Sequence, residues 1–255
     1  MATAIKPIIV IPSRLASTRL PSKPLADIHG APMIVHCLRR AEAAGVAPVL
    51  VACGDRAIFD AVTAAGGKAV MTRSDHPSGS DRVFEAVEKL DPQGAHDVVI
   101  NLQGDLPSLD PKVVADVLKP LEDPAVDIAT LAVEITDPAE RGNPDAPRAA
   151  VAFAPGSRRA RALYFSRSVV PWPGADDTAP LYYHLGIYAF RRTALARFVS
   201  LPQTVLEQRE KLEQLRALED GMRIDVWRVD TLPLGVDTPA DLAKARALLA
   251  PDAAE

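Results

Sequence analysis

The sequence predicts an α/β fold built on a mainly parallel central sheet, and three observations lead to this prediction. Short β-rich runs alternate with helical patterns over residues 7–105, which is the arrangement of consecutive crossover units. The strand-like runs are almost wholly apolar, as in strands that are covered on both faces. The composition is 48% hydrophobic and 24% charged over 255 residues, which is typical of a globular protein with a large core.

The first half contains the clearest elements. Because a parallel sheet binds ligands at the carboxyl ends of its strands, we expect polar segments 12–23, 53–56 and 103–105 to lie at one edge of the sheet. The expected strands occupy the runs 7–11, 48–53, 68–72 and 97–105, and the expected helices 33–45, 55–67 and 81–90.

The second half is richer in strands and less regular. Proline- and glycine-containing segments at 137–147 and 170–180 interrupt it. We find no linker that would separate independent domains, so we expect a single domain over 1–255 with a small β-rich embellishment at about 140–220. The expected strands are 127–135, 149–153, 162–167, 182–190 and 223–230.

Two late helices have strong boundary signals. Thr204 and Glu207 form a T-x-x-E capping box that opens an expected helix over 205–220, which ends before Gly221. A last helix begins within the segment GVDTPADL, which supplies an N-cap residue, a proline at the first helical position and an acidic residue near the third. These are Thr238, Pro239 and Asp241.

Charge and cysteine usage exclude several classes of protein. A net charge of −4 argues against general affinity for nucleic acid or an anionic membrane, since both need a basic face. Cys37 and Cys53 lack C-x-x-C spacing, so we expect reduced, buried thiols and a cytoplasmic protein. We expect neither a secretory signal in MATAIKP nor a membrane span, because no uncharged apolar run approaches ~20 residues.

The loop after the first strand is rich in cations. Arg14, Arg19 and Lys23 lie within ten residues, and such a cluster suits the oxygens of a triphosphate, which must be neutralised before a nucleophile approaches. The loop contains neither a P-loop motif nor the dinucleotide motif G-x-G-x-x-G. From the loop alone, an exposed basic surface is an equally good interpretation.

Two aspartates are candidate metal ligands. Asp105 ends a buried strand and Asp237 precedes the last helix. Mg²⁺ usually takes one or two protein carboxylates together with substrate oxygens and water. Taken singly, Asp105 is equally well explained as a turn residue after Gly104, and Asp237 as a residue near a helix cap.

Seven segments together resemble, in order and spacing, the 3-deoxy-D-manno-octulosonate (Kdo) cytidylyltransferases, also called CMP-Kdo synthetases. The resemblance covers about residues 6–249 and implies a Rossmann-like nucleotidyltransferase three-layer sandwich. It also implies an Mg²⁺-dependent homodimer that makes CMP-Kdo and pyrophosphate from CTP and Kdo for lipopolysaccharide biosynthesis. The segments are IPSRLASTRLPSKPL, MTRSDHPSGSDR, NLQGD, ALYFSR, HLGIYAFR, LEQLRALEDG and GVDTPADL.

The resemblance assigns roles to residues of the first half and to one aspartate near the end. It implies a catalytic set that handles the phosphates and the metal, in which two aspartates hold Mg²⁺, and a set that binds the nucleotide. The catalytic candidates are Arg14, Lys23, Asp105 and Asp237, with Asp105 and Asp237 as metal ligands. The nucleotide-binding candidates are Pro12, Ser13, Arg14, Arg19, Lys23, Arg73, Ser80, Asp81 and Gln103.

The resemblance also implies a pocket for Kdo, an acid with many hydroxyls. Arg167 would bind its carboxylate, or would instead be a surface arginine or pair with Asp176 or Asp177. The alternative interpretation of Glu213 is an exposed i,i+4 ion pair with Arg209. The alternative interpretation of His184 and Tyr188 is that both are core residues. The sugar-binding candidates are Arg167, His184, Tyr188, Glu213 and Gln214.

The chain departs from the family pattern at three positions. Leu106 stands where the family often has Glu, Ser22 where glycine is common, and Arg148 at the usual lysine position. Two other functions stay open: a cytidylyltransferase for another acidic sugar, such as a sialic acid or amino-substituted Kdo, and an inactive nucleotide-binding relative. Redox chemistry on a Rossmann fold is disfavoured, because the glycine fingerprint is absent.

Overall fold

The computed structural model describes residues 5–172, 174 and 179–250. The chain divides into two compact units. Of the described residues, we call 5–115 with 233–250 the N-terminal unit, and 116–172, 174 and 179–232 the central unit. The embellishment expected at about 140–220 falls within the central unit, and a single domain over 1–255 stays a prediction.

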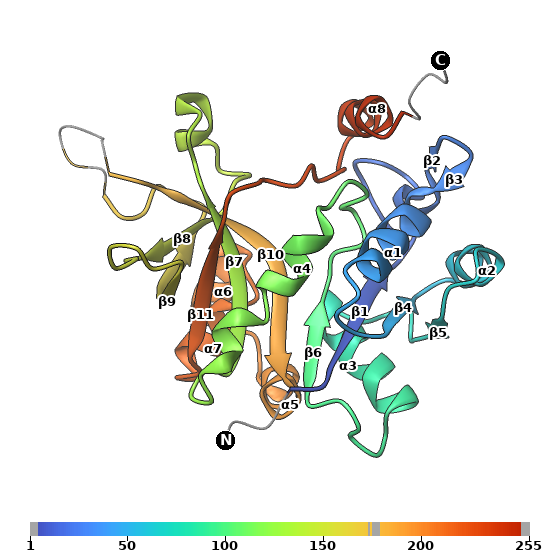
Figure 1. Cartoon of the computed structure of the whole chain (residues 1–255), viewed down its shortest axis with the longest axis horizontal. Coiled ribbons are helices and arrows are strands. Elements are labelled where there is room, and N and C mark those ends of the chain that lie inside the picture. The colour runs from blue at the N-terminus through green and yellow to red at the C-terminus, as the bar shows by residue number, and fades with distance from the viewer. Residues whose placement is uncertain (1–4, 173, 175–178, 251–255) are drawn as a thin grey trace. The chain divides into compact units, whose positions relative to one another are not determined.

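The sheet of the N-terminal unit is parallel, as expected. Its strands run in the order β5, β4, β1, β6 (Figure 1). The register pairs Ile9 with Val49 and Pro7 with Val98. All three pairings are parallel, so the carboxyl ends of these strands share one edge. The strands are β1 (Pro7–Ser13), β4 (Val49–Cys53), β5 (Ala69–Met71) and β6 (Val98–Asn101).

Helices cover both faces of this sheet. Four consecutive β1 residues, Ile8 to Ile11, are buried, which requires cover on both sides because successive side chains point to opposite faces. The helices α1 and α3 both pack against β1. The helices of the unit are α1 (Met33–Ala43), α2 (Arg56–Ala64), α3 (Gly79–Leu90), α4 (Pro111–Asp116) and α8 (Pro239–Leu248), and a short hairpin joins β2 (Asp27–Ile28) to β3 (Ala31–Pro32).

The last helix, α8, returns to the N-terminal unit. Leu242 and Ala245 of α8 are buried in one cluster with Ile28, Met33 and Cys37. The α8 start confirms the expected cap: the Thr238 hydroxyl accepts a hydrogen bond from the Asp241 N–H, with a proline in the first turn. This docking holds the segment before α8 next to the strand ends.

The sheet of the central unit is mixed, so the expectation of a mainly parallel sheet holds only for the N-terminal unit. Strand β7 pairs in parallel with β11 and antiparallel with β10, while β9 pairs antiparallel with β11 and β8. The strands are β7 (Ile128–Glu134), β8 (Arg148–Val151), β9 (Arg159–Ser166), β10 (Tyr182–Arg191) and β11 (Ile224–Val229). Helix α5 (Arg192–Ser200) and the 3₁₀ turns η2 (Lys119–Glu122) and η3 (Pro138–Gly142) also belong here.

The single helix expected over 205–220 is wrong. The chain forms α6 (Val205–Glu210) and α7 (Leu215–Glu219), separated where Lys211 adopts a left-handed φ of 56°. The capping box at Thr204 is present. The break lets Arg216 donate to Glu207 at 2.5 and 2.8 Å in a buried ion pair.

One departure from the family pattern has a structural explanation. The Arg148 side chain is fully buried, and its guanidinium donates to the carbonyls of Glu140, Arg141, Asn143 and Arg167. Arginine offers several N–H donors in a fixed plane, whereas lysine offers one point of attachment. Arg148 therefore holds the segment of η3 against the start of β8.

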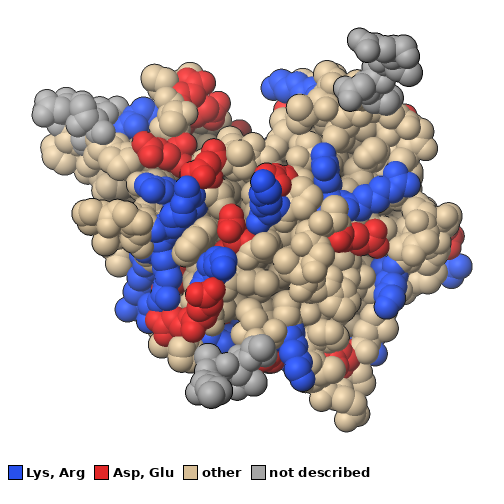
Figure 2. Space-filling view, viewed as in Figure 1, with Lys and Arg blue, Asp and Glu red and all other residues tan. Residues whose placement is uncertain are grey.

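Other expectations from composition agree with the structure. Cys37 and Cys53 are free and buried, and burial raises the pKa of the Cys53 thiol to about 12. Within the described residues, no helix is both long and apolar enough to cross a bilayer. On the face in Figure 2, Lys and Arg side chains are interspersed with Asp and Glu side chains, as the small net charge predicts.

Candidate active site

A cavity of about 790 Å³ lies in the N-terminal unit, at the carboxyl ends of its strands. This volume is within the range of small-molecule sites. The walls come from the loop after β1, the β5–α3 connection, the segment after β6 and the residue before the Thr238 cap. Its lining residues are Pro12, Ser13, Arg14, Ala16, Ser17, Thr18, Arg19, Lys23, Pro24, His76, Ser78, Gly79, Arg82, Gln103, Gly104, Asp105 and Asp237.

The loop after β1 is built to hold cations at this cavity. The Leu15 N–H donates to Asp55 at 2.8 Å, which anchors the start of the loop to the end of β4. At its far end Ser22 has a left-handed φ of 53° and directs the chain into the 3₁₀ turn η1 (Lys23–Leu25). Arg14, Arg19 and Lys23 all line the cavity, so the loop is more than an exposed basic surface.

Lys23 lies between the two candidate metal aspartates. Its Nζ is 2.8 Å from Asp105 Oδ2 and 2.9 Å from Asp237 Oδ1, and Arg19 Nη2 is 3.1 Å from the other oxygen of Asp237. Burial opposes the charged form of Lys23, but pairing with Asp105 and Asp237 outweighs it and raises the Lys23 pKa. The Val236 N–H donates to the Asp105 carbonyl at 3.0 Å, which fixes the segment of Asp237 beside Asp105.

The two carboxylates fit a magnesium ion that also binds substrate oxygens. Because both reach the same ammonium group, their oxygens converge on one point of the cavity wall. Among the described residues, no group of three or more His, Cys, Asp or Glu side chains could hold a metal. A pair of carboxylates matches the sparse protein coordination that Mg²⁺ shows beside phosphates.

The cavity also contains a hydroxyl that a ligand would satisfy. Ser13 is 6% exposed, and its Oγ is buried without a hydrogen-bond partner in the part of the chain that the structure describes. A buried polar group without a partner costs free energy. A bound nucleotide would remove that cost, and the nucleotide-binding role of Ser13 stays a prediction.

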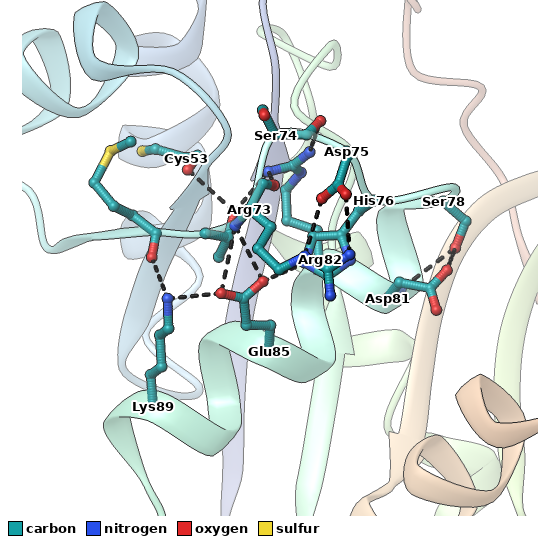
Figure 3. A network of polar contacts seen from close by, with 12 residues as sticks. Cys53, Arg73, Ser74, Asp75, His76, Ser78, Asp81, Arg82, Glu85 and Lys89 are labelled. Atoms are coloured by element: carbon teal, nitrogen blue, oxygen red, sulfur yellow. Dashed lines mark hydrogen bonds and ion pairs between the residues drawn. The ribbon is translucent and has the colours of Figure 1, made fainter.

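Three nucleotide-binding candidates lie off the cavity lining, and other residues of the same segment take the wall. Arg73 is exposed and pairs with Asp75 at 2.9 Å, Ser80 is fully buried, and the Asp81 carboxylate accepts from the Ser78 hydroxyl at 2.7 Å (Figure 3). The proposed roles of these three residues stay predictions. The residues of the segment that do line the cavity are His76, Ser78, Gly79 and Arg82.

Sequence reasoning missed these four lining residues although it singled out their segment. The quoted block MTRSDHPSGSDR contains all of them. Arg82 was identifiable as a second basic residue of the block. Which face of α3 Arg82 occupies depends on the direction in which the β5–α3 connection enters the helix, and no sequence signal predicts that direction.

Three of the sugar candidates of the central unit, His184, Tyr188 and Gln214, form a buried neutral network. The Tyr188 hydroxyl donates to Gln214 Oε1 at 3.1 Å, Gln214 Nε2 donates to His184 Nδ1 at 3.3 Å, and His184 Nε2 donates to Thr130 Oγ1 at 2.9 Å. The Thr130 hydroxyl donates onward to the carbonyls of β10. Each member therefore has its partner, as expected for core positions, and the sugar-binding roles stay predictions.

Burial sets the protonation of this network. Burial lowers the pKa of His184 to about 3, so the imidazole is neutral. Burial and, after it, the negative charge of Glu213 raise the pKa of Tyr188. Glu213 lies half-buried between α6 and α7, so the exposed helical pair considered for it does not describe its setting.

Arg167 is held at the end of β9. Its Nε donates to the Glu210 carbonyl at 2.9 Å and its Nη1 donates to the Pro144 carbonyl at 3.1 Å. Its own N–H donates to the Glu210 carboxylate at 2.9 Å. The alternative pairing with Asp176 or Asp177 lies outside the described residues.

Comparison with known proteins identifies relatives over almost the whole chain. A family model described as cytidylyltransferase matches residues 8–224. A 3-deoxy-manno-octulosonate cytidylyltransferase of Paramagnetospirillum magneticum is 62% identical over 245 residues, which are 96% of this chain and 98% of the relative. One from Rhodospirillum centenum is 61% identical, over 96% of this chain and 94% of the relative.

Solved structures give the same result. A structure of CMP:2-keto-3-deoxy-manno-octonic acid synthetase complexed with CTP has a TM-score of 0.87 and 46% identity, and the match covers 96% of this chain and 98% of that chain. A 4-diphosphocytidyl-2C-methyl-D-erythritol synthase from Anaerococcus prevotii has a TM-score of 0.63 at 12% identity, over 96% and 98% of the two chains. The second match shows an α/β fold alone.

Proposed function

This chain belongs to the 3-deoxy-manno-octulosonate cytidylyltransferase family, and we propose that it transfers CMP from CTP to the anomeric hydroxyl of Kdo. The products are CMP-Kdo and pyrophosphate. The observation that carries the proposal is the convergence of Lys23, Asp105 and Asp237 on one point of a cavity that Arg14 and Arg19 also line. The CTP complex of the 46% identical structure supports CTP as the nucleotide.

The reaction needs two things from the phosphate side of the cavity. The anomeric oxygen of Kdo bonds to the α-phosphorus as the bond from that phosphorus to the bridging oxygen breaks, pyrophosphate leaves with the electron pair, and the proton of the hydroxyl passes to solvent. Lys23, Arg14 and Arg19 supply fixed positive charge where the leaving group becomes more negative. They also hold the triphosphate so that the hydroxyl approaches in line.

Asp105 and Asp237 would hold Mg²⁺ in this proposal. When bound there, the ion neutralises phosphate charge and lowers the pKa of the attacking hydroxyl. Lys23 pairs with both carboxylates, so it offsets their mutual repulsion and keeps them together for the substrate. The Ser13 hydroxyl, together with backbone groups at Pro12, would bind the nucleotide itself.

The sugar side of the proposal concerns the central unit. Arg167 carries the only positive charge among the five sugar-binding candidates, and a guanidinium binds a carboxylate through two parallel hydrogen bonds. His184, Tyr188, Glu213 and Gln214 supply a surrounding set of donors and acceptors. Supporting this assignment, their segments are those that resemble the family.

The proposal includes the finer features that the family implies. These are a nucleotidyltransferase three-layer sandwich, a homodimer and a cytoplasmic location. The TM-score of 0.87 to the CTP-bound relative supports the first. The two free, buried cysteines favour a reducing compartment.

A product assay tests the proposed function. The purified protein is incubated with CTP, Mg²⁺ and a panel of acids comprising Kdo, its amino-substituted form and a sialic acid, and each sugar nucleotide is identified by mass. We expect CMP-Kdo as the main product. Turnover of another acid at higher kcat/KM would reassign the substrate, while CTP binding without any product would indicate an inactive relative.

A further inference from the structure

His76 and Ser78 of the segment 72–78 line the cavity on the β5 side, and two side chains of α3 hold this segment (Figure 3). Arg82 is 2% exposed and donates to Thr72 Oγ1 at 2.6 Å and to the carbonyls of Arg73 and Ser74 at 2.8 and 3.4 Å. Gly54 provides the room for this guanidinium, because a Cβ there would lie 2.7 Å from Arg82 Nη1. Arg82 therefore fixes the backbone of the segment.

Glu85, one turn further along α3, fixes a side chain of the same segment. Its carboxylate accepts from the Arg73 N–H at 3.1 Å, from Lys89 Nζ at 2.6 Å and from Nε2 of His76. Burial opposes the charge, yet the hydrogen bonds from Lys89 and His76 lower the pKa of Glu85 to about 2. An ionised carboxylate only accepts hydrogen bonds, so Nε2 of His76 is the nitrogen that carries the proton.

This fixes what the His76 ring offers to a ligand. Its side chain is 10% exposed and lines the cavity. A neutral imidazole with its proton on Nε2 has a single acceptor, Nδ1.

The sheet order indicates which part of a nucleotide meets His76. Strands β5 and β6 lie on opposite sides of β1 in the order β5, β4, β1, β6. Asp105 and its partner Lys23 belong to the β6 side, whereas His76 follows β5. A nucleotide whose phosphates bind at Lys23 therefore extends its base toward His76, past Pro12, whose Cγ would lie 3.4 Å from a Cβ placed on Gly79.

We propose that Glu85 is a positioning residue that presents Nδ1 of His76 as the acceptor for the 4-amino group of cytosine, so that this pair selects CTP over UTP. Uracil has a carbonyl oxygen at that position, and two facing acceptors repel each other. A site built around one hydrogen-bond polarity rejects the opposite one because a buried group is left unpaired. The inference rests on the proposed function, since it takes a cytidine nucleotide as the occupant of the cavity.

Two variants and one control test the inference. Glu85→Gln keeps the shape of the side chain, but its amide can donate as well as accept, so it no longer fixes the tautomer. His76→Phe keeps a ring and removes the acceptor. Lys89→Met removes a partner of the same carboxylate from its exposed side and leaves the His76 contact in place.

The readout is the pair of Kd values for CTP and UTP, measured by calorimetry at pH 8. Thermal unfolding checks that each variant is folded. We expect both variants to lower the preference for CTP over UTP by about tenfold, and Lys89→Met to leave it within about twofold. The kcat at saturating CTP should change by less than about twofold in Glu85→Gln, because the base lies away from the phosphates. If Glu85→Gln does not fold, His76→Phe alone decides.

Three results overturn the inference: an unchanged preference in folded variants, equal weakening of CTP and UTP, or the same loss of preference in Lys89→Met. Failure of the proposed function has a different signature. In that case the wild-type protein would bind CTP but form no CMP-sugar. The ratio of the Kd values for UTP and CTP would still test the role of His76.

Discussion

The polar clusters of the two units differ in charge and in burial. In the N-terminal unit, the side chains of Lys23, Asp105 and Asp237 are charged, and they are 15%, 29% and 44% exposed. In the central unit, His184, Tyr188 and Gln214 are at most 5% exposed and form a neutral chain of hydrogen bonds. The first cluster faces an open cavity, whereas the second is satisfied by its own members.

This difference indicates how each cluster can serve a ligand. Partly exposed ion pairs contribute little to stability, so phosphates and a metal can replace the partners of Lys23 at low cost. A buried, fully satisfied network instead fixes the geometry of its members. We therefore expect substitutions in the first cluster to affect turnover more than stability, and the reverse in the second.

The largest effect should come from removing a carboxylate of the first cluster. Asp105→Ala and Asp237→Ala should each lower kcat on the order of a thousandfold or more, because each removes a ligand of the proposed Mg²⁺. Steady-state pyrophosphate release measures this. Asp60→Asn is the control, since Asp60 pairs with Arg56 on the surface of α2; near-wild-type turnover in a folded Asp105 or Asp237 variant would remove the assignment.

Lys23 should have the next largest effect, and a selective one. Lys23→Met should lower kcat on the order of a hundredfold, because its proposed partners are the phosphates that carry the leaving-group charge. CMP lacks those phosphates, so its Kd should change by less than about twofold. Comparing CTP and CMP by calorimetry checks this, and equal weakening of both nucleotides would place Lys23 elsewhere.

The central unit should respond to pH through His184. The folded-state pKa of His184, about 3, lies below the ordinary histidine value of 6.5, so the unfolded chain takes up a proton first as the pH falls. Stability from this group is complete above about pH 6.5 and decreases toward pH 3. Between pH 7.5 and pH 5 the loss should be about 2 kcal/mol.

Chemical unfolding at the two pH values measures that loss. The variant His184→Gln should lose about 2 kcal/mol less on acidification than the wild type, whatever its stability at pH 7.5. His29→Gln is the control, because His29 is exposed. Identical pH dependence in wild type and His184→Gln would contradict a neutral buried imidazole.

Arg167 tests whether a cation of the central unit also binds substrate. Losing one charge-assisted contact costs about 1.5–3 kcal/mol, so Arg167→Lys should raise the KM for Kdo about tenfold or more while the KM for CTP stays nearly constant. Titration of Kdo at saturating CTP and Mg²⁺ measures this. A purely structural role through Glu210 and Pro144 would instead lower the unfolding temperature and leave the KM for Kdo unchanged.

The sequence predicted most of what depends on local chemistry. The strands of the N-terminal unit, the cap at Thr238 and the cationic loop that ends at Lys23 follow from apolar runs, turn residues and charge, and the structure has them. The sequence did not predict features whose geometry depends on contacts between residues far apart in the chain. The break at Lys211 needs a left-handed lysine, which no local signal marks, and it accompanies the buried pair of Glu207 and Arg216.

The candidate site shows the same division. The aspartates and cations next to strand ends were found because parallel topology brings such positions to one edge. His76 and Arg82 were missed as cavity residues because their orientation depends on how α3 packs and on the space at Gly54. The antiparallel pairings of the central unit were missed because alternation of strand-like runs does not specify strand direction.

The smallest expected effect lies in the turn that places Lys23. Ser22 has a φ of 53° and a ψ of 31°, a left-handed conformation that costs a residue with a Cβ roughly 1–2 kcal/mol. Glycine adopts it freely but loses more chain entropy on folding. The net gain in unfolding free energy for Ser22→Gly should therefore be at most about 1 kcal/mol, or about 2–4 °C in unfolding temperature.

The kinetic constants of Ser22→Gly should not change, because the Lys23 pairs with Asp105 and Asp237 do not involve the Ser22 side chain. Ser17→Gly is the matched control in the same loop, since Ser17 is not among the described residues with positive φ, and it should give no gain. A destabilised Ser22→Gly would mean that the serine side chain stabilises the turn by more than the strain it carries.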